Sequence, residues 1–379
     1  MNASPLHVVH IVEAAAGGVG RHIRDLVEQS VRRGVRVSLF FGLSRADEGF
    51  RRFAADLSSA DSMVVGVEMG VTPVGLLSAA LATRSIHKSL QARNLRPSII
   101  HGHSSVGGVV ARLLAWRMGL PVVYTPHAPI IMNEQLGFTK RSVYGAIERR
   151  LSRRTDFQIA VSHAELRLTQ ERGWRPRNSA VIYNAVPGIT PGKVGLRHAV
   201  RDGRCRVVSV GRLSAQKDPF LWRDVAASSD PARFEFAWAG SGELERQLRA
   251  NGLPGCARLL GHVEDVPALL GGADVLLMTS RYEGAPLALL EAMAAGLPIV
   301  CRAFPGADEI VADGVTGILV PGTHPADYVA ALERLAASAD MRARMGHAAQ
   351  RRVEACFLLP TMVDRTVDVY YSLLGRRLQ

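Results

Sequence analysis

The stretch ADVLLMTSRYEGAPLALLEAMAAGLPIVCRAF (residues 273–304) decides the fold class. It contains two apolar runs, at 273–280 and 297–304, with a helix-like segment between them. Continuous apolar runs bounded by turns predict strands that are buried on both faces, and such strands occur in parallel sheets. The stretch therefore predicts a strand–helix–strand unit with a right-handed crossover, the building block of an α/β fold.

The same alternation continues along most of the chain. Eleven apolar runs are of this kind: 6–12, 35–41, 98–103, 121–127, 157–163, 180–186, 206–213, 234–240, 273–280, 297–304 and 316–322. The alternation stops once, at VPGITPGKVGLRHAVRDGR (186–204), which is rich in Gly and Pro and has no apolar period. We interpret this segment as a linker between two Rossmann-like, doubly wound domains, 1–195 and 196–358, that face a central cleft.

Composition is that of a globular protein. The 379 residues are 47% hydrophobic and 21% charged, which excludes wholesale disorder. The four cysteines are far apart and have no Cys-x-x-Cys spacing, so we expect reduced thiols and neither a disulfide framework nor a zinc site; they are Cys205, Cys256, Cys301 and Cys356. No basic leader precedes the first apolar run, and no run approaches the roughly 18 residues of a membrane span. We therefore expect a cytoplasmic protein.

The net charge of +12 lies entirely in the first half of the chain. Residues 1–195 contain 25 Lys/Arg and 13 Asp/Glu, whereas residues 196–379 contain 21 of each. A basic half suggests an anionic partner, which could be a nucleic acid, an anionic membrane surface or a phosphorylated substrate. Scattered surface arginines with no such partner are the alternative.

Residues 10–26, HIVEAAAGGVGRHIRDL, predict a strand, a small-residue loop and a helix. Gly17, Gly18 and Gly20 would let the backbone approach an anion at the helix start. The dinucleotide fingerprint is incomplete, because Ile23 stands where its third glycine would be. The loop is either a tight turn or a site for a phosphate or substrate.

Histidines end two of the predicted strands. His101 and His103 have the i, i+2 spacing of metal ligands, but no carboxylate follows at ligand spacing, so we interpret them as structural. His127 follows the next strand, between Pro126 and Pro129, where it could be structural or functional.

Residues 139–156, TKRSVYGAIERRLSRRTD, predict an amphipathic basic helix. Val143, Ile147 and Leu151 recur at helical spacing, and arginines surround them. This helix either packs on the domain through that apolar stripe or lies on an anionic membrane surface.

Two loops of the second domain carry groups that suit a phosphorylated sugar. In VSVGRLSAQKDP (208–219) a strand ends at Gly211, and Arg212 and Lys217 follow in a loop that could bind a diphosphate. It is not a Walker A loop, which needs Gly-Lys-Ser/Thr.

The opening stretch is the second of these loops. Pro286 fits the first position of a helix, with Glu283 before the helix and Glu291 inside it. The N–H groups of Gly284, Ala285 and Leu287 would then point out of the helix start. Two acids could also indicate a hydrolase, but a hydrolytic pair straddles the scissile bond, and these belong to one loop–helix unit.

Taken together, these motifs resemble glycosyltransferase family 4, retaining enzymes of the two-domain GT-B architecture. The resemblance covers nearly the whole chain through GGVGRH (17–22), YTPH (124–127), IAVSHAE (159–165), IYNAV (182–186), VGRLSAQKD (210–218), AGSGE (239–243), LLGHVEDV (259–266), Glu283-x7-Glu291 and DEIVADGVTGILVPG (308–322). The order and separation of the Arg212/Lys217 pair and the Glu-x7-Glu segment are specific.

The resemblance implies roles for these residues. Arg212 and Lys217 would bind the donor diphosphate, Glu283 the sugar hydroxyls and Glu291 the ribose. The backbone of Gly211 and of Gly284, Ala285, Pro286 and Leu287 would approach the sugar and phosphates. His127 would contact the donor sugar, and Gly18 would lie near the acceptor and phosphates. The base would pack near Gly240, Glu243, His262 and Val263. Residues 359–379 would form a helix that crosses back to the first domain.

The chain departs from the family pattern at Pro286, where many relatives have glycine, so one amide donor to the ligand is missing. It also lacks an Asp-x-Asp metal motif, so we expect no metal and no cofactor. Arg212, Lys217 and the helix start would then meet the charge of the leaving diphosphate. The family mechanism is front-face transfer with retention.

The implied function is transfer of a hexosyl unit from a nucleotide diphosphate sugar to a glycan acceptor. A UDP-sugar is favoured as donor, and a GDP-mannose type is possible. The acceptor would be lipid-linked, in cell-surface polysaccharide or lipopolysaccharide synthesis at the inner face of the plasma membrane. A nucleotide-sugar epimerase of the same architecture is one alternative. A nucleic-acid-binding protein is another, although aromatic residues for base stacking are sparse, at 6%.

Overall fold

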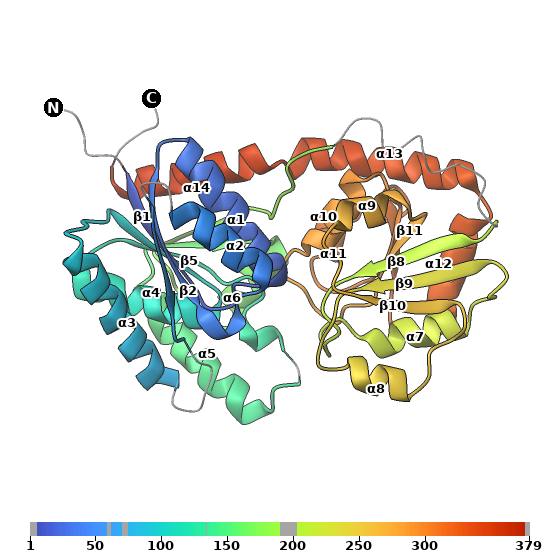
Figure 1. The fold of residues 1–379 in the computed structure, drawn as a ribbon, viewed down its shortest axis with the longest axis horizontal. Helices are drawn as coiled ribbons and strands as arrows, with labels where there is room; N and C mark the ends of the chain where they lie inside the picture. The colour runs from blue at the N-terminus through green and yellow to red at the C-terminus, as the bar shows by residue number, and fades with distance from the viewer. Residues whose placement is uncertain (1–5, 59–61, 70–74, 134, 190–202, 376–379) are drawn as a thin grey trace. The chain divides into compact units, whose positions relative to one another are not determined.

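The computed structural model describes residues 6–58, 62–69, 75–133, 135–189 and 203–375. The chain forms two compact units (Figure 1). The N-unit contains Met1–Asn184 and Pro360–Gln379, and the C-unit contains Ala185–Leu359. The domain boundary predicted near residue 196 lies outside the described residues.

The N-unit is built on a seven-stranded sheet with the order β3-β2-β1-β4-β5-β6-β7, in which every pair is parallel. Its strands are β1 (His7–Val12), β2 (Arg36–Gly42), β3 (Met63–Val67), β4 (Ile99–His103), β5 (Val122–Thr125), β6 (Phe157–Ala160) and β7 (Asn178–Val181). All six residues of β1 are buried, as expected for a central strand covered on both faces. The predicted α/β class is therefore confirmed.

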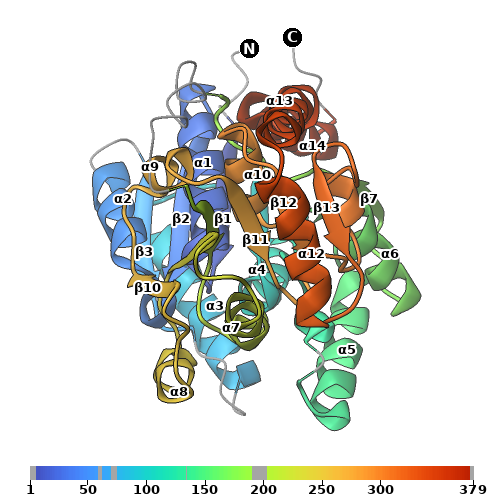
Figure 2. The ribbon, with the colours of Figure 1, turned by 90° about the vertical axis from the view of Figure 1, so that its right-hand side faces the viewer.

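Helices cover both faces of this sheet (Figures 1 and 2). They are α1 (Gly17–Arg32), α2 (Glu48–Ser58), α3 (Gly75–Ala92), α4 (Ser105–Met118), α5 (Phe138–Ser152), α6 (His163–Glu171) and α14 (Leu359–Leu373), with short 3₁₀ turns at Leu43–Arg45 and Ile130–Met132. Helix α14 is held to the N-unit by polar contacts: Arg33 Nε donates to Asp364 at 2.7 Å, and the Arg365 guanidinium donates to the carbonyl of Val181 at 2.9 Å.

The C-unit contains a six-stranded parallel sheet with the order β10-β9-β8-β11-β12-β13. Its strands are β8 (Cys205–Val210), β9 (Phe234–Ala239), β10 (Ala257–Gly261), β11 (Val275–Met278), β12 (Ile299–Arg302) and β13 (Gly317–Val320). Its helices are α7 (Pro219–Ala227), α8 (Glu245–Ala250), α9 (Val266–Gly271), α10 (Leu287–Ala294), α11 (Ala307–Ile310), α12 (Pro325–Ala336) and α13 (Ala339–Cys356). This is the second doubly wound domain that the sequence predicted.

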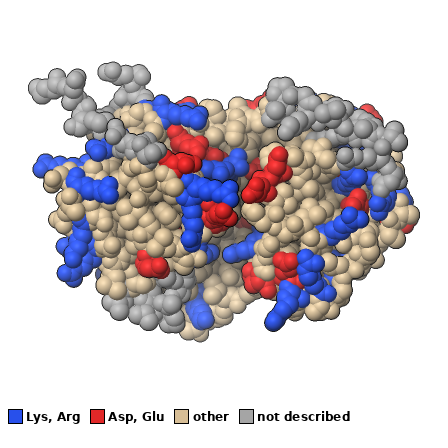
Figure 3. All heavy atoms as spheres, viewed as in Figure 1, with Lys and Arg blue, Asp and Glu red and all other residues tan. Residues whose placement is uncertain are grey.

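The face of the molecule shown in Figure 3 is not dominated by one charge. On the face shown in Figure 3, Lys and Arg side chains are interspersed with acidic and uncharged residues. Among the described residues, all four cysteines are free thiols, and only Cys356 is exposed. No helix in the described part of the chain is both long and apolar enough to cross a lipid bilayer.

Candidate active site

The C-unit sheet reverses its strand order between β8 and β11, and the loops after these strands lie at that switch point. Open α/β sheets bind ligands at the carboxyl ends of their strands at such points. The loop after β8 covers residues 211–218, and the loop after β11 covers residues 279–286. Predicted site residues lie in both loops.

The two loops meet through Lys217 and Glu283. Lys217 Nζ lies 2.6 Å from Glu283 Oε1, and the side chains are 17% and 9% exposed. Gln216 Nε2 donates to the other carboxylate oxygen of Glu283 at 3.2 Å and to the carbonyl of Tyr282 at 3.0 Å. The backbone N–H of Arg281 returns a hydrogen bond to the carbonyl of Gln216 at 2.8 Å. The structure thus brings together a cation and a carboxylate that were predicted to act on neighbouring parts of one ligand.

Asp218 holds the same loop in place through its backbone conformation and its side-chain contacts. Its φ of 51° is in the left-handed region, which aspartate tolerates better than most residues. Its carboxylate forms ion pairs with Arg281 at 3.0 Å and Arg302 at 3.5 Å. Thr279 Oγ1 donates to the carbonyls of Lys217 and Asp218 at 2.9 and 3.1 Å. These contacts fix the backbone that carries Lys217.

Glycines bring the loops after β8 and β9 into close contact. A Cβ added to Gly240 would lie 2.1 Å from the carbonyl oxygen of Gly211, and Gly240 has a φ of +131°. Gly211 has a φ of +152°, and its own Cβ would lie 3.0 Å from Cε of Lys217. Gly240 is therefore required by packing between the two loops, and Gly211 is favoured by its positive φ, whatever they do for a ligand.

Other predicted residues of the C-unit lie on loops at the same edge of the sheet. Arg212 and Glu243 are exposed in the loops after β8 and β9. His262 is exposed and Val263 is partly exposed after β10, and the β10 end is tied to β9 because Gly240 N–H donates to Gly261 O at 2.6 Å. The edge is thus lined by polar and basic groups that a nucleotide could reach.

The start of α10 differs from the prediction by one residue. Pro286 is the N-cap, with φ −70° and ψ 119°, and the helix begins at Leu287, so the prediction that Pro286 is the first helical residue is wrong. The reason is its extended ψ, which keeps Pro286 outside the helix. Gly284, Ala285 and Leu287 are buried around this turn, and Glu291 is partly exposed one helical turn later.

In the N-unit, Gly17 and Gly18 are exposed at the start of α1 and have open space around them. Gly17 N–H donates to Asp47 Oδ2 at 3.0 Å. Gly20 differs, because a Cβ there would lie 3.0 Å from the backbone of Ala15. Gly20 therefore serves packing between helix and loop, whereas Gly17 and Gly18 are exposed, with the N–H of Gly17 already bonded to Asp47.

His127 is held in an unusual backbone conformation after β5. His127 and Ala128 both have positive φ, 52° and 62°. Two successive non-glycine residues in this region are strained, and such strain persists where surrounding contacts determine it. The buried carboxylate of Glu165 makes such contacts. It accepts hydrogen bonds from the N–H of Ala128 at 2.7 Å and from the N–H of Val161 at 3.1 Å. Burial raises the pKa of Glu165 to about 7.

His127 lies beside four other histidines. The sequence did not predict that these five residues cluster. Two triads, His10–His101–His103 and His22–His103–His127, each bring ring nitrogens within 4.8 Å of one another. Burial lowers the pKa of His10 to about 3 and that of His22 to about 4, and it also holds the pKa of the other three well below the usual range. All five are therefore neutral near pH 7.

Helix α5 packs only in part through its predicted apolar stripe, since Ile147 and Leu151 are partly buried. Val143 is 53% exposed, and the buried residues of the helix are Glu148 and Ser152. Glu148 is buried because it pairs with the equally buried Arg112 at 2.8 Å. Val143 is thus the stripe residue that is open to solvent, together with Phe138, which is 86% exposed.

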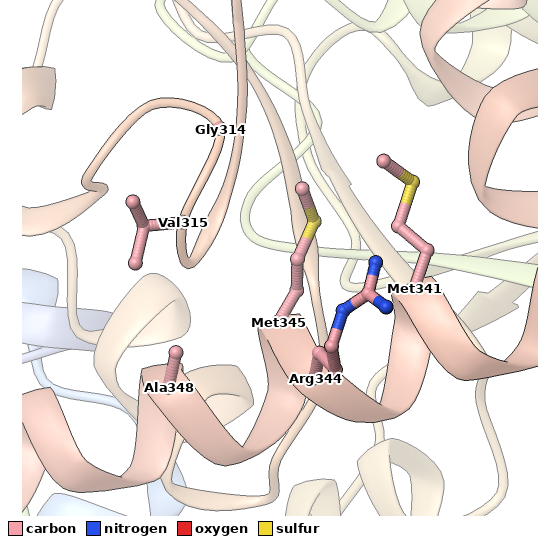
Figure 4. A pocket seen from close by; sticks show the side chains of 6 residues that line it. All are labelled: Gly314, Val315, Met341, Arg344, Met345 and Ala348. Atoms are coloured by element: carbon pink, nitrogen blue, oxygen red, sulfur yellow. The ribbon is translucent and has the colours of Figure 1, made fainter.

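A shallow pocket in the C-unit lies between α13 and the turn before β13 (Figure 4). Gly314, Val315, Met341, Arg344, Met345 and Ala348 line it. None of them is a predicted site residue, and no charged pair in the pocket suggests a reaction.

Several residues that lie beside the predicted ones, some in the C-unit and some in the N-unit, escaped the sequence interpretation. They are Gln216, Asp218, Thr279, Arg281, Arg302, Glu165, His10 and His22. Gln216 and Asp218 flank Lys217 directly in the sequence, so the prediction of Lys217 as a site residue could have pointed to them. His10 and His22 gave no local signal, because their partners lie in distant segments.

Comparison with known proteins identifies the family of both units. The family model of the glycosyl transferase 4-like domain matches residues 17–185, and that of glycosyl transferases group 1 matches residues 197–352. Together they span most of the chain.

Relatives and solved structures match over nearly full length. A D-inositol 3-phosphate glycosyltransferase of Geodermatophilus obscurus is 29% identical over 94% of this chain and 84% of its own. The UDP-Gal:alpha-D-GlcNAc-diphosphoundecaprenol alpha-1,3-galactosyltransferase of Escherichia coli is 26% identical over 79% and 81%. The crystal structure of Anabaena HepE with UDP and glucose has a TM-score of 0.78 at 21% identity, covering 97% of this chain and all of that one.

Proposed function

This chain belongs to the GT-B glycosyltransferases of the family 4 type, and we propose that it transfers a hexosyl unit from a nucleotide diphosphate sugar to a lipid-linked glycan. The observation that carries the proposal is the contact between Lys217 and Glu283 at the switch point of the C-unit sheet. Lys217 can bind a phosphate group there, and Glu283 beside it can accept hydrogen bonds from hydroxyl groups. A ligand in which a sugar is joined to a diphosphate presents both groups next to each other.

In the proposed reaction the C-unit loops bind the donor. Arg212 and Lys217 neutralise the diphosphate as the glycosidic bond breaks, and the N–H groups before α10 add partial positive charge. Glu283 accepts hydrogen bonds from the sugar, and Glu291 accepts them from the ribose. Gly240, Glu243, His262 and Val263 lie on loops that would border the base. This chemistry assigns no step to a metal ion or a cofactor.

The N-unit supplies the remaining groups of the proposal. His127 contacts the donor sugar, and the exposed backbone of Gly18 lies near the acceptor and phosphates. The Escherichia coli relative supports a lipid-linked acceptor and a UDP-linked donor, since its name states both. A role in cell-surface polysaccharide or lipopolysaccharide synthesis follows from that acceptor class.

We also propose that α5 contacts the anionic membrane that would hold such an acceptor. Phe138 and Val143 are exposed apolar residues on this helix, and Arg149, Arg150 and Arg153 are exposed at its C-terminal end. A helix that binds a membrane surface inserts apolar side chains at the membrane–water interface and places arginines against lipid phosphates.

Thermal-shift screening against a panel of UDP- and GDP-sugars tests the donor, because a ligand that binds the native state raises the unfolding temperature. We expect one donor to raise it and to be consumed on addition of a lipid-linked glycan, with the product retaining the anomeric configuration. A panel in which no nucleotide sugar changes the unfolding temperature would refute the proposal. Conversion of the sugar nucleotide without any acceptor would instead identify an epimerase.

A further inference from the structure

Five histidines of the N-unit cluster together, and three of them, His10, His103 and His127, are joined end to end. His10 Nδ1 and His103 Nε2 are 3.0 Å apart, and His103 Nδ1 and His127 Nε2 are 3.2 Å apart. His103 therefore uses one nitrogen for each neighbour. The chain runs from the buried interior of β1 to the partly exposed loop after β5.

Ring geometry shows that these contacts are hydrogen bonds. The ring centroids are 5.3 Å apart for His10 and His103, and 5.5 Å apart for His103 and His127. Each separation exceeds the corresponding N···N distance by 2.3 Å, which is what two centre-to-nitrogen distances add up to. The facing nitrogens thus lie close to the line between the ring centres. Ligands of one metal ion would instead direct their lone pairs at a common point outside that line.

The neighbouring histidines hold the chain in place without joining it. His101 has both nitrogens occupied, by Tyr370 Oη at 2.6 Å and Thr125 Oγ1 at 2.9 Å, and its ring packs on His103 at 3.9 Å between centroids. The ring of His22 packs edge-on against His127 at 4.6 Å.

The buried end of the chain fixes its direction. His10 is fully buried, and its Nε2 has no hydrogen-bond partner within the described residues. A neutral imidazole has one N–H and one bare nitrogen, and a buried N–H without a partner is rarer than a buried acceptor without one. His10 therefore carries its proton on Nδ1 and donates to His103, which in turn donates from Nδ1 to Nε2 of His127.

We propose that His10 and His103 are positioning residues that lock His127 in the Nδ1–H tautomer, so that His127 presents a hydrogen-bond donor to an oxygen atom of the donor sugar. The identity of that ligand rests on the proposed function. The tautomer does not, because it follows from the chain alone. Nδ1 of His127 has no protein partner among the described residues, and His127 is the partly exposed member of the chain. A sugar hydroxyl or phosphate oxygen is the class of acceptor that such a donor takes.

Nitrogen-15 NMR of the full chain, labelled at histidine, tests the tautomers near neutral pH. Single substitutions such as His127→Gln assign the signals. We expect His10, His103 and His127 all to be protonated at Nδ1 and bare at Nε2. A proton on Nε2 of His127 would overturn the inference even if glycosyl transfer is observed. Stoichiometric binding of Zn²⁺ that disappears in His103→Gln would also overturn it, since these nitrogens would then be ligands.

The functional arm compares two buried histidines of the same strand. His10→Phe removes the donor that orders the chain, whereas His7→Phe removes a histidine whose partner is Ser38 at 2.9 Å. His10→Phe should mix the tautomers of His127 and raise KM for the nucleotide sugar about five- to tenfold, the size expected for one hydrogen bond. His7→Phe should leave both readouts unchanged. Equal effects of the two substitutions would show that His10 has only a packing role. If no nucleotide sugar is turned over, the proposed function fails while the NMR result still decides the tautomer.

Discussion

Lys217 and Glu283 are 66 positions apart in the chain, yet Lys217 Nζ lies 2.6 Å from Glu283 Oε1. The pair joins the loops that follow two neighbouring strands, β8 and β11, at the switch point of the sheet. Each side chain therefore orients the other before any ligand binds. A ligand that satisfies both must carry negative charge and hydroxyl groups within a few ångströms of each other, as a nucleotide sugar does.

Gln216→Met should weaken the site without touching the cation. Gln216 holds one oxygen of Glu283, so its loss should lower kcat/KM for the nucleotide sugar about fivefold, the effect of one net hydrogen bond. Steady-state kinetics checks this. The matched control is Gln247→Met on the exposed side of α8, which should be neutral. An unchanged kcat/KM in Gln216→Met would mean that Glu283 needs no such support.

Glu165→Ala should destabilise the loop that carries His127. It leaves the buried N–H groups of Ala128 and Val161 without acceptors, and we expect the free energy of unfolding to fall by about 2 kcal/mol or more. Urea unfolding measures the change, with exposed Glu171→Ala on the same helix as control. Equal stability of the two variants would contradict the role given to Glu165.

Buried His7 should make stability depend on pH. Burial, followed by the charge of Arg36, lowers the pKa of His7 from 6.5 to about 4, so the folded state resists a proton that the unfolded chain accepts. The stabilisation is complete above pH 6.5 and is lost as pH falls toward 4, by up to about 3 kcal/mol. Comparing wild type with His7→Gln at pH 7.5, 5.5 and 4.5 isolates this contribution. A difference in unfolding free energy that stays constant with pH would show that His7 does not titrate in this way.

Lipid binding through α5 predicts a dependence on anionic lipid. In vesicle sedimentation, binding should increase with phosphatidylglycerol content, decrease with salt, and decrease severalfold in Phe138→Ser/Val143→Ser. Leu81→Ser is the control, because Leu81 is an exposed apolar residue on a different helix, α3. Equal sedimentation with neutral and anionic vesicles would contradict the proposal that α5 binds an anionic membrane.

The apolar runs predicted most of the fold because central parallel strands are buried on both faces. Two strands were missed, β3 and β10, and both are edge strands. Three of the five residues of β3 are only partly buried, and Ala257 is the one buried residue of β10. Edge strands need no continuous apolar sequence, so their pattern is weak.

The site was predictable where its residues lie in loops between a predicted strand and a predicted helix. Lys217 and Glu283 stood out because each sits in a loop with a strand before it and a helix after it. The histidine chain was not predictable, because His10 and His103 are 93 positions apart and meet only through the register of β1 against β4. The burial of Glu148 on α5 was not predictable from the sequence either, because it depends on an ion pair with the distant Arg112.

The most direct measurement of the central claim is the rate at which nucleotide diphosphate is released from the donor, in wild type, Arg212→Met and Lys217→Met. The exposed Lys88→Met is the control. We predict release by wild type and by the control, and a loss of about 100-fold in each of the other two, because each removes a charge that stabilises the leaving diphosphate. Wild-type rates in both Arg212→Met and Lys217→Met would contradict the account.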